Sequence, residues 1–268
     1  MHVLVAVDEL DPTAQQHLDA GRQLAQAFGS GLLAFHTCAA RDLAAATRDL
    51  TALAGGVEVE VAPYGERGRA AAIVEAAERH QCDLVVMGTQ GLDPFVSRFL
   101  DSPAHKVLEA SRSPVLIVHA ARGLRRGGHG VVMVAMADPV FSVRVLQHGL
   151  NLARALHEGA KIVHVGSREE DPVATLLHQQ DAHPSQVMVA AAAAEFKQSG
   201  VEAEGQVIPN YSGIADELAQ AADRLDADVI VIGSSGKLDL GEWLLGSIAE
   251  AVLHRSQRPV LVVPSLTL

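Results

Sequence analysis

Two glycine-containing turns in the last third of the chain have the residue types and spacing to hold an anion. Gly233 and Gly236 enclose two serines directly after an apolar segment, and Gly246-Ser247 follows nine residues later, before a segment typical of a helix. Glycine has no Cβ, so backbone N–H groups can approach an anion closely. A helix start adds N–H groups without intrahelical partners and the positive end of the helix dipole. The spacing therefore predicts a phosphate-binding loop.

The same residues also have a purely structural interpretation. A GxxG turn after a strand can serve the turn alone. Ser247 with Glu250 three residues later has the spacing of a capping box, in which the serine caps its own helix. The combination of strand, GxxG, spacer and Gly-Ser before a helix favours the phosphate site over the structural interpretation.

Other chemical signatures are weak in this sequence. It contains no GxxxxGK[ST], GxSxG or HExxH motif, which disfavours P-loop, hydrolase and metalloprotease chemistry. His178, Asp181 and His183 lie close together, and we interpret them as a polar loop, not a metal site. His36 and His164 end corresponding apolar segments, where each either contacts a ligand or forms a buried hydrogen bond.

The elements that must position the glycine turns occur twice along the chain. The matching segments are residues 2–8 with 131–138, 32–36 with 160–164, 83–91 with 228–236, and 113–118 with 258–263. The spacing grows from 128–130 residues in the first two pairs to 145 in the last two. The second copy therefore has roughly 15 extra residues, which we place around residues 178–186. We predict domains at residues 1–120 and 131–268, joined by an exposed Gly- and Arg-rich linker at 121–130.

Each copy shows the order β-α-β-α-β-α-β-α-β. In the first copy, strands are expected at residues 3–7, 32–36, 57–61, 84–87 and 115–118, and helices at 12–28, 39–53, 70–80 and 102–111. Apolar strands that alternate with helices predict an α/β fold in which each domain has a five-stranded parallel sheet with helices on both faces. Ligands bind such sheets at the carboxyl ends of the strands. The glycine turn after residues 229–232 lies at that edge.

Composition excludes several classes of function. A net charge of −11 and only 3% aromatic residues argue against nucleic-acid binding. Two cysteines without a CxxC motif argue against a disulfide framework or a cysteine zinc site. The chain has no apolar run of about 18 residues and no basic leader before its first apolar segment. We therefore expect a cytoplasmic protein that does not bind membranes.

The spacing Gly233-x2-Gly236-x9-Gly246-Ser247 resembles the nucleotide motif of the ATP-binding universal stress proteins. Asp8 resembles the acidic residue after the family's first strand, and residues 83–88 and 228–233 resemble its Asp-Leu-Ile-Val-Met-Gly strand. The resemblance covers nearly the whole chain, twice. It implies a tandem member with two Rossmann-like domains of the adenine nucleotide alpha hydrolase-like type. It also implies that the protein binds ATP, with or without Mg²⁺, and serves a nucleotide-dependent regulatory role in a stress response.

The resemblance assigns nucleotide contacts to eleven residues of the second copy. They are Ala135, Ala137 and Asp138 beside adenine and ribose, Val165 at the adenine edge, Ile232, Gly233, Ser235 and Gly236 around ribose and phosphates, and Gly246, Ser247 and Ile248 at the β- and γ-phosphates. One position departs from the family pattern. Counted without gaps, Asp8 matches Ala137, and Asp138 stands one residue late. Either the strand carries a bulge, or the second site lacks its usual acidic contact.

The first copy departs at the phosphate loop. Asp101 stands where the family has its third glycine. A carboxylate about 5 Å from a phosphate charge opposes binding by about 3 kcal/mol at an effective dielectric constant of about 20. This corresponds to more than a hundredfold in affinity. We therefore expect nucleotide in the second copy and an empty or weak site in the first.

Two short apolar segments, residues 114–118 and 259–263, are expected at sheet edges, where an unpaired strand is a liability. Family members dimerise through this strand, so the resemblance implies an intramolecular pseudo-dimer in which the two edges pair. Homodimers through other surfaces and a regulatory protein partner stay open. Two alternatives to ATP binding also stay open. Slow ATP hydrolysis or phosphoryl transfer needs a base or arginine finger that the sequence does not reveal, and a scaffold would have lost both pockets.

Overall fold

The computed structural model describes residues 2–89, 102–119, 123–125, 130–166, 184–234 and 245–264. The strands are β1 (His2–Val7), β2 (Gly31–Cys38), β3 (Glu58–Pro63), β4 (Leu84–Thr89), β5 (Val115–His119), β6 (Val131–Ala135), β7 (Gly159–Val165), β8 (Ala203–Ile208), β9 (Val229–Gly233) and β10 (Val260–Val263). The helices are α1 (Ala14–Phe28), α2 (Leu43–Ala54), α3 (Gly68–Arg79), α4 (Pro103–Ala110), α5 (Pro139–Leu156), α7 (Pro184–Gln198), α8 (Ile214–Arg224) and α9 (Ser247–Arg255), with a 3-10 turn at Ala40–Asp42. The predicted alternation of strands and helices is confirmed.

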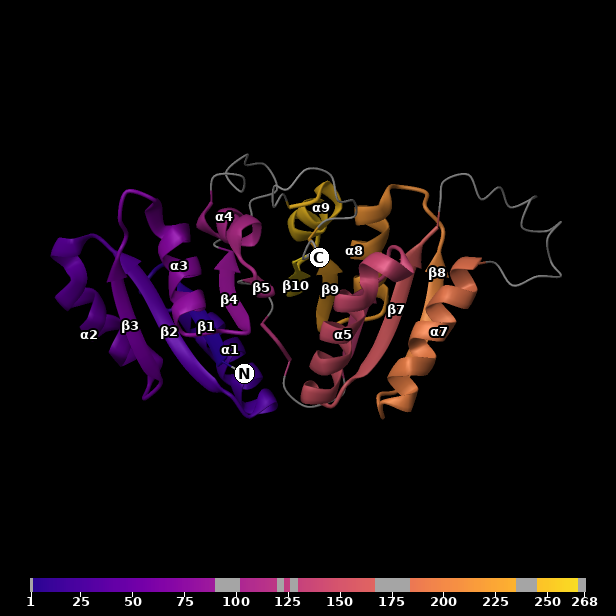
Figure 1. The fold of residues 1–268 in the computed structure, drawn as a ribbon, viewed down its shortest axis with the longest axis horizontal. Coiled ribbons are helices and arrows are strands. Elements are labelled where there is room, and N and C mark those ends of the chain that lie inside the picture. Colours follow the sequence, from indigo (N-terminus) through magenta and orange to yellow (C-terminus); the bar gives the residue numbers. More distant parts are fainter. Residues whose placement is uncertain are drawn as a thin grey trace.

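All the strands join in one sheet with the order β3-β2-β1-β4-β5-β10-β9-β6-β7-β8. Neighbouring strands within each half are parallel, and among the described strands β5 and β10 form the one antiparallel pair, with Leu116 opposite Leu261. The predicted pairing of the two apolar edge strands is therefore confirmed. The two five-stranded halves meet at the centre of the molecule (Figure 1).

Helices cover both faces of the sheet. One core cluster contains residues of α1, α2, α5 and α7, and the other contains residues of α3, α4, α8 and α9, so the two sets of helices cover opposite faces. Side chains of successive strand residues point to opposite faces. Val3 and Val5 therefore lie in the core that α1 covers, and Leu4 and Ala6 lie in the core that α3 covers on the other face. Each core continues through both halves. The division into domains at residues 1–120 and 131–268 stays a prediction.

Equivalent contacts relate the two halves residue by residue. His36 Nδ1 lies 2.7 Å from the Val7 carbonyl oxygen, and His164 Nδ1 lies 2.9 Å from that of Met136. Val7 therefore corresponds to Met136, and Asp8 to Ala137. The β6–β7 register runs without interruption to Ala135, and the Met136 N–H then donates to Val163. The strand has no bulge, which settles the alternative that the sequence left open.

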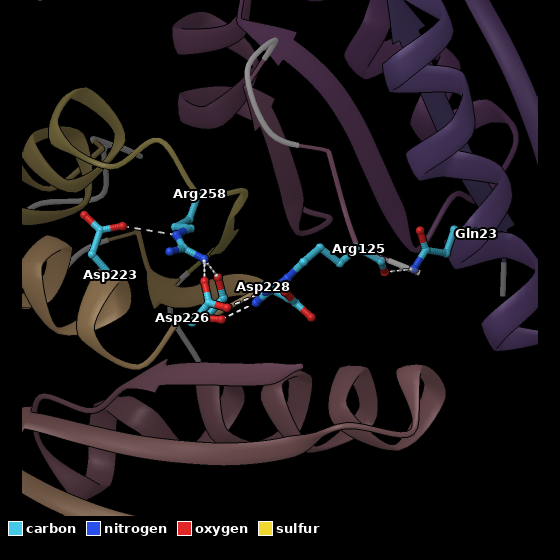
Figure 2. A network of polar contacts seen from close by, with 7 residues as sticks. Gln23, Arg125, Asp223, Asp226, Asp228 and Arg258 are labelled. Carbon is cyan, nitrogen blue, oxygen red and sulfur yellow. Dashed lines mark hydrogen bonds and ion pairs between the residues drawn. The ribbon is translucent and has the colours of Figure 1, made fainter. Parts of the chain in front are cut away.

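The described part of the connecting segment is anchored to both halves. Arg125 pairs with Asp226 and Asp228, and its carbonyl oxygen accepts a hydrogen bond of 2.7 Å from Gln23 of α1 (Figure 2). The Arg125 side chain is 49% exposed, and Leu124 packs against the core. Gly123 and Arg125 are exposed, as expected for a linker, whereas Leu124 is half-buried because the core covers part of its side chain.

Within the described residues, none of the helices has the length and apolar character needed to cross a membrane. The same part of the chain contains no group of three His, Cys, Asp or Glu side chains that could bind a metal ion. His178, Asp181 and His183 lie outside the described residues.

Candidate functional site

A cavity of about 480 Å³ lies at the carboxyl ends of β6, β7 and β9, between α5, α8 and α9. Its position is the one expected for a ligand in an α/β sheet, and its volume is typical of small-molecule sites. Eight of the eleven residues implied by the resemblance line it. They are Ala135, Ala137, Val165, Ile232, Gly233, Gly246, Ser247 and Ile248.

Three of the implied residues are not among those lining the cavity. Asp138 is exposed, and its carbonyl oxygen accepts from the Ser142 N–H at 2.9 Å. Ser235 and Gly236 lie outside the described residues. The position that corresponds to Asp8 is Ala137, so the acidic contact expected after the first strand is replaced by a methyl group.

The start of α9 differs from the predicted capping box. The N-cap is Gly246, with extended backbone angles of φ −65° and ψ 144°, and no side chain caps the helix. Ser247 is the first helical residue. In the first half, by contrast, Ser102 caps α4 and accepts from the His105 N–H at 3.1 Å. The alternative interpretation, in which Ser247 caps its own helix, is therefore wrong, because Gly246 takes the cap position and Ser247 lies one step inside the helix.

This uncapped start presents backbone donors to the cavity. The first backbone bond within α9 runs from the Glu250 N–H to the Gly246 carbonyl at 3.0 Å. The N–H groups of Ser247, Ile248 and Ala249 therefore have no partner inside the helix. All three residues line the cavity, and the Gly246 N–H donates to the Ser234 carbonyl, which holds the helix start against the end of β9. This is the geometry of an anion site at a helix N-terminus.

Further lining residues were not predicted from the sequence. They are Met136, Ser142, Val145, Val163, His164, Ile214, Leu218, Ser234 and Ala249, of which His164 alone had been considered as a contact. Ser142 Oγ accepts from the Ala137 N–H at 3.1 Å, which ties α5 to the end of β6. Helical spacing shows that Ser142 and Val145 share a face of α5, as do Ile214 and Leu218 of α8. It does not show that these faces reach the cavity.

The cavity lining has little charge. Among its described residues there is no Asp, Glu, Lys or Arg, and His164 is the one titratable side chain. Because the Met136 carbonyl can only accept, His164 Nδ1 carries the hydrogen of their 2.9 Å bond. An anion in this cavity would therefore be bound by backbone N–H groups and hydroxyls instead of an ion pair.

A model of the universal stress protein family matches residues 39–119 and 129–264. The chain belongs to the universal stress protein family. The two matched segments and the two equivalent halves show a tandem universal stress protein.

Individual relatives support the same assignment. The universal stress protein MJ0577 of Methanocaldococcus jannaschii is 46% identical over 48 residues, which cover 18% of this chain and only 30% of that protein. A universal stress protein of Mycolicibacterium smegmatis is 28% identical over 133 residues, 50% of this chain and 95% of its own. A Pseudomonas aeruginosa UCBPP-PA14 structure described as a universal stress protein shares the fold, with a TM-score of 0.71, 20% identity, and coverage of 98% of this chain and 92% of that one.

The N-terminal half of this universal stress protein carries different side chains at the corresponding positions. Asp8, His17 and Arg69 stand where the C-terminal half has Ala137, Val145 and Ile214. An ion pair of 2.9 Å joins Arg69 Nη1 to Asp8 Oδ1. The C-terminal cavity has apolar side chains at these three positions.

His17 covers the glycine at the end of β4. Its ring is only 6% exposed, and a Cβ added to Gly88 would lie 1.8 Å from His17 Cε1. Burial lowers the pKa of His17, against the opposing effect of Asp11 and Asp8. The ring is therefore neutral near pH 7. Gly88 is thus needed for packing of His17, whereas Asp101, on which the sequence argument relied, lies outside the described residues.

Proposed function

We propose that this tandem universal stress protein binds an adenine nucleotide, ATP, in the cavity of its C-terminal half. The observation that carries the proposal is the convergence of eight implied contact residues on one cavity beside the uncapped start of α9. Those residues are far apart in the sequence, from Ala135 to Ile248, and no single motif accounts for their meeting.

The two ends of the cavity would contact different parts of the nucleotide. The N–H groups of Ser247 and Ile248, with the Ser247 hydroxyl, would bind the phosphates, because both residues are exposed at the mouth of the cavity. Ala135, Ala137 and Val165 would contact the adenine and ribose at the ends of β6 and β7. A Mg²⁺ ion would be held by the phosphates themselves, because no carboxylate is among the described lining residues.

The proposal does not extend nucleotide binding to the N-terminal half. The Asp8–Arg69 ion pair and the buried His17 ring occupy positions that are apolar and open in the C-terminal half. The proposal is therefore one nucleotide in each chain.

The function proposed for the bound nucleotide is regulatory. Phosphoryl transfer needs a base or a cationic group beside the γ-phosphate, and the described lining offers only His164, whose Nδ1 is held by Met136. Binding without turnover would make occupancy follow the ATP level in the cell. A protein partner that responds to occupancy, a cytoplasmic location and a role in a stress response belong to the same proposal.

Retention of nucleotide by the purified protein tests the proposal. Denatured protein releases its ligand, and anion exchange identifies it. Intact ATP after storage is the expected result; ADP would indicate hydrolysis instead. If no nucleotide is found and added ATP causes no thermal shift, the scaffold alternative replaces the proposal.

The variant Gly246→Asp locates the site. The extended backbone of Gly246 is open to any residue, so the fold should persist while a carboxylate enters the phosphate end. We expect ATP affinity to fall more than a hundredfold, from a repulsion of about 3 kcal/mol at about 5 Å. Ala52→Asp serves as the control, because Ala52 is an exposed residue of α2 in the N-terminal half and the variant adds the same charge. Unchanged affinity in Gly246→Asp would place the nucleotide elsewhere.

A further inference from the structure

A second cavity, of about 570 Å³, lies on the α1 and α5 side of the sheet where β5 meets β10. The starts of β4 and β5 form one wall, α5 forms the other, and the end of α1 closes it. Its charged lining comes from both halves of the chain. The polar residues that matter are Asp83, Arg112, Arg144, His148 and Arg154.

The cavity gathers positive charge on a protein that is otherwise acidic, with a net charge of −11. It has three arginines and one carboxylate, Asp83, which already accepts a 2.8 Å hydrogen bond from the His2 N–H. In the part of the chain that the structure describes, no carboxylate forms an ion pair with Arg112, Arg144 or Arg154.

Arg144 shows that this charge is partly desolvated. Its side chain is half-buried, and Nη1 donates to the Pro264 carbonyl at 2.8 Å. A carbonyl solvates a guanidinium but does not neutralise it. Burial lowers the pKa of Arg144, and burial followed by the charge of Arg144 lowers the pKa of His148. An anion in the cavity would relieve the cost of leaving this charge without a counterion.

The corresponding groove of the other half shows what the same architecture does when its charges are paired. That groove, of about 430 Å³, is lined at the starts of β9 and β10, and the connecting residues Gly123, Leu124 and Arg125 enter it. Arg125 pairs with Asp226 and Asp228, and Arg258 pairs with Asp226 and Asp223 (Figure 2). Arg125 and Arg258 are thus both paired with carboxylates of the same chain.

The second cavity has lost part of that internal compensation. Gln81 stands where Asp226 stands in the other half, and both residues have the same positive φ of 50°. Asp83 corresponds to Asp228, so this cavity keeps one of the two carboxylates with which Arg125 pairs in the other groove. The cavity thus has one carboxylate, Asp83, beside the guanidinium groups of Arg112, Arg144 and Arg154.

We propose that this cavity binds a small, multiply charged oxyanion at a site separate from the C-terminal nucleotide cavity. The guanidinium group matches phosphate and carboxylate oxygens in pairs, and three such groups from two walls could enclose one ligand. The volume is within the range of small-molecule sites. The ligand class is a metabolite that bears several phosphate or carboxylate charges.

The test uses the full chain carrying Gly246→Asp, so that phosphate binding at the start of α9 does not interfere. Inorganic tripolyphosphate and citrate are titrated separately by calorimetry at 150 mM salt. Saturable binding of one equivalent of either probe is expected, and the probe that binds more tightly distinguishes phosphate from carboxylate ligands. If neither probe binds, the proposal is wrong.

Variants then assign the binding to this cavity. Arg112→Gln combined with Arg154→Gln removes two exposed charges and should weaken the probe at least tenfold. The matched control, Arg48→Gln with Arg224→Gln, removes two exposed arginine charges elsewhere and should leave the affinity within twofold. Equal weakening in both double variants would mean general surface attraction and would overturn the site. Because Gly246→Asp is present throughout, this result is independent of whether the protein binds ATP.

Discussion

Replacement of Glu158 by glutamine should stabilise the protein increasingly as pH rises. Glu158 precedes β7 and is 6% exposed, and Asp228 precedes β9 and is 4% exposed. Gly130 packs so tightly on them that an added Cβ would lie 1.5 Å from Asp228 Oδ2 and 3.0 Å from Glu158 Cδ. Burial and the neighbouring Asp228 raise the pKa of Glu158 to about 8, although Arg125 opposes this. Glu158 is therefore protonated at neutral pH and donates to Asp228.

The raised pKa sets the size of the effect. Between about pH 4.5 and 8 the folded protein holds a proton on Glu158 that the unfolded chain has released. The free energy of unfolding therefore falls by about 1.4 kcal/mol for each pH unit in this window because of this one group. Glutamine keeps a donor for Asp228 without titrating. From pH 5.5 to 7.5 the stability of Glu158→Gln relative to the native chain should rise by roughly 2 to 3 kcal/mol.

Urea denaturation at several pH values measures this difference, because other titrating groups cancel between the two proteins. Glu195→Gln, on the exposed side of α7, is the matched control and should show a difference that is constant with pH. A flat difference for Glu158→Gln would mean that Glu158 is ionised in the folded protein, and the argument from its burial beside Asp228 would be wrong.

Three further variants test contacts described above. Gly88→Ala should lower the free energy of unfolding by about 2 kcal/mol, because its Cβ meets the His17 ring; thermal melts should show most of this loss recovered when His17→Ala is added, and simple additivity would contradict the contact. Arg125→Gln should cost roughly 1 to 3 kcal/mol in urea denaturation, since it leaves the buried Asp228 without its cation; a neutral effect would mean that this ion pair does not stabilise the fold. Val145→His should weaken ATP binding at least tenfold in calorimetry, because it copies His17 into the C-terminal half; since Val145 is only 4% exposed, a cooperative thermal melt of the free variant serves as the control for folding, and unchanged affinity would dismiss His17 as a reason for the difference between the halves.

The architecture could be predicted because it depends on patterns that are local and repeated. Apolar strands alternating with helices indicated the parallel halves, and the two Pro-Val-Leu segments indicated that the two edge strands pair; the structure adds the register, with Leu116 opposite Leu261. The internal match also identified Ala137 as the partner of Asp8, and the equivalent His36 and His164 contacts confirm that alignment.

The site was predictable only where a residue type has a backbone consequence. Gly246 and Ser247 were found, yet the cap was assigned to the wrong one, because both residue types are common at helix starts and only φ and ψ decide between them. His17 and Arg125 were missed for a different reason. Each acts through a partner far away in the chain, Gly88 or Asp228, and spacing carries no information about such contacts.

The antiparallel junction of β5 and β10 places two related units on one polypeptide. In an assembly of two identical chains, every substitution appears in both copies, so a change that closes one pocket closes its twin. Fusion removes that constraint. One unit can accept His17 and the Asp8–Arg69 pair while its neighbour keeps Val145 and an accessible cavity. The junction thus allows a symmetric framework to acquire two separate chemical identities.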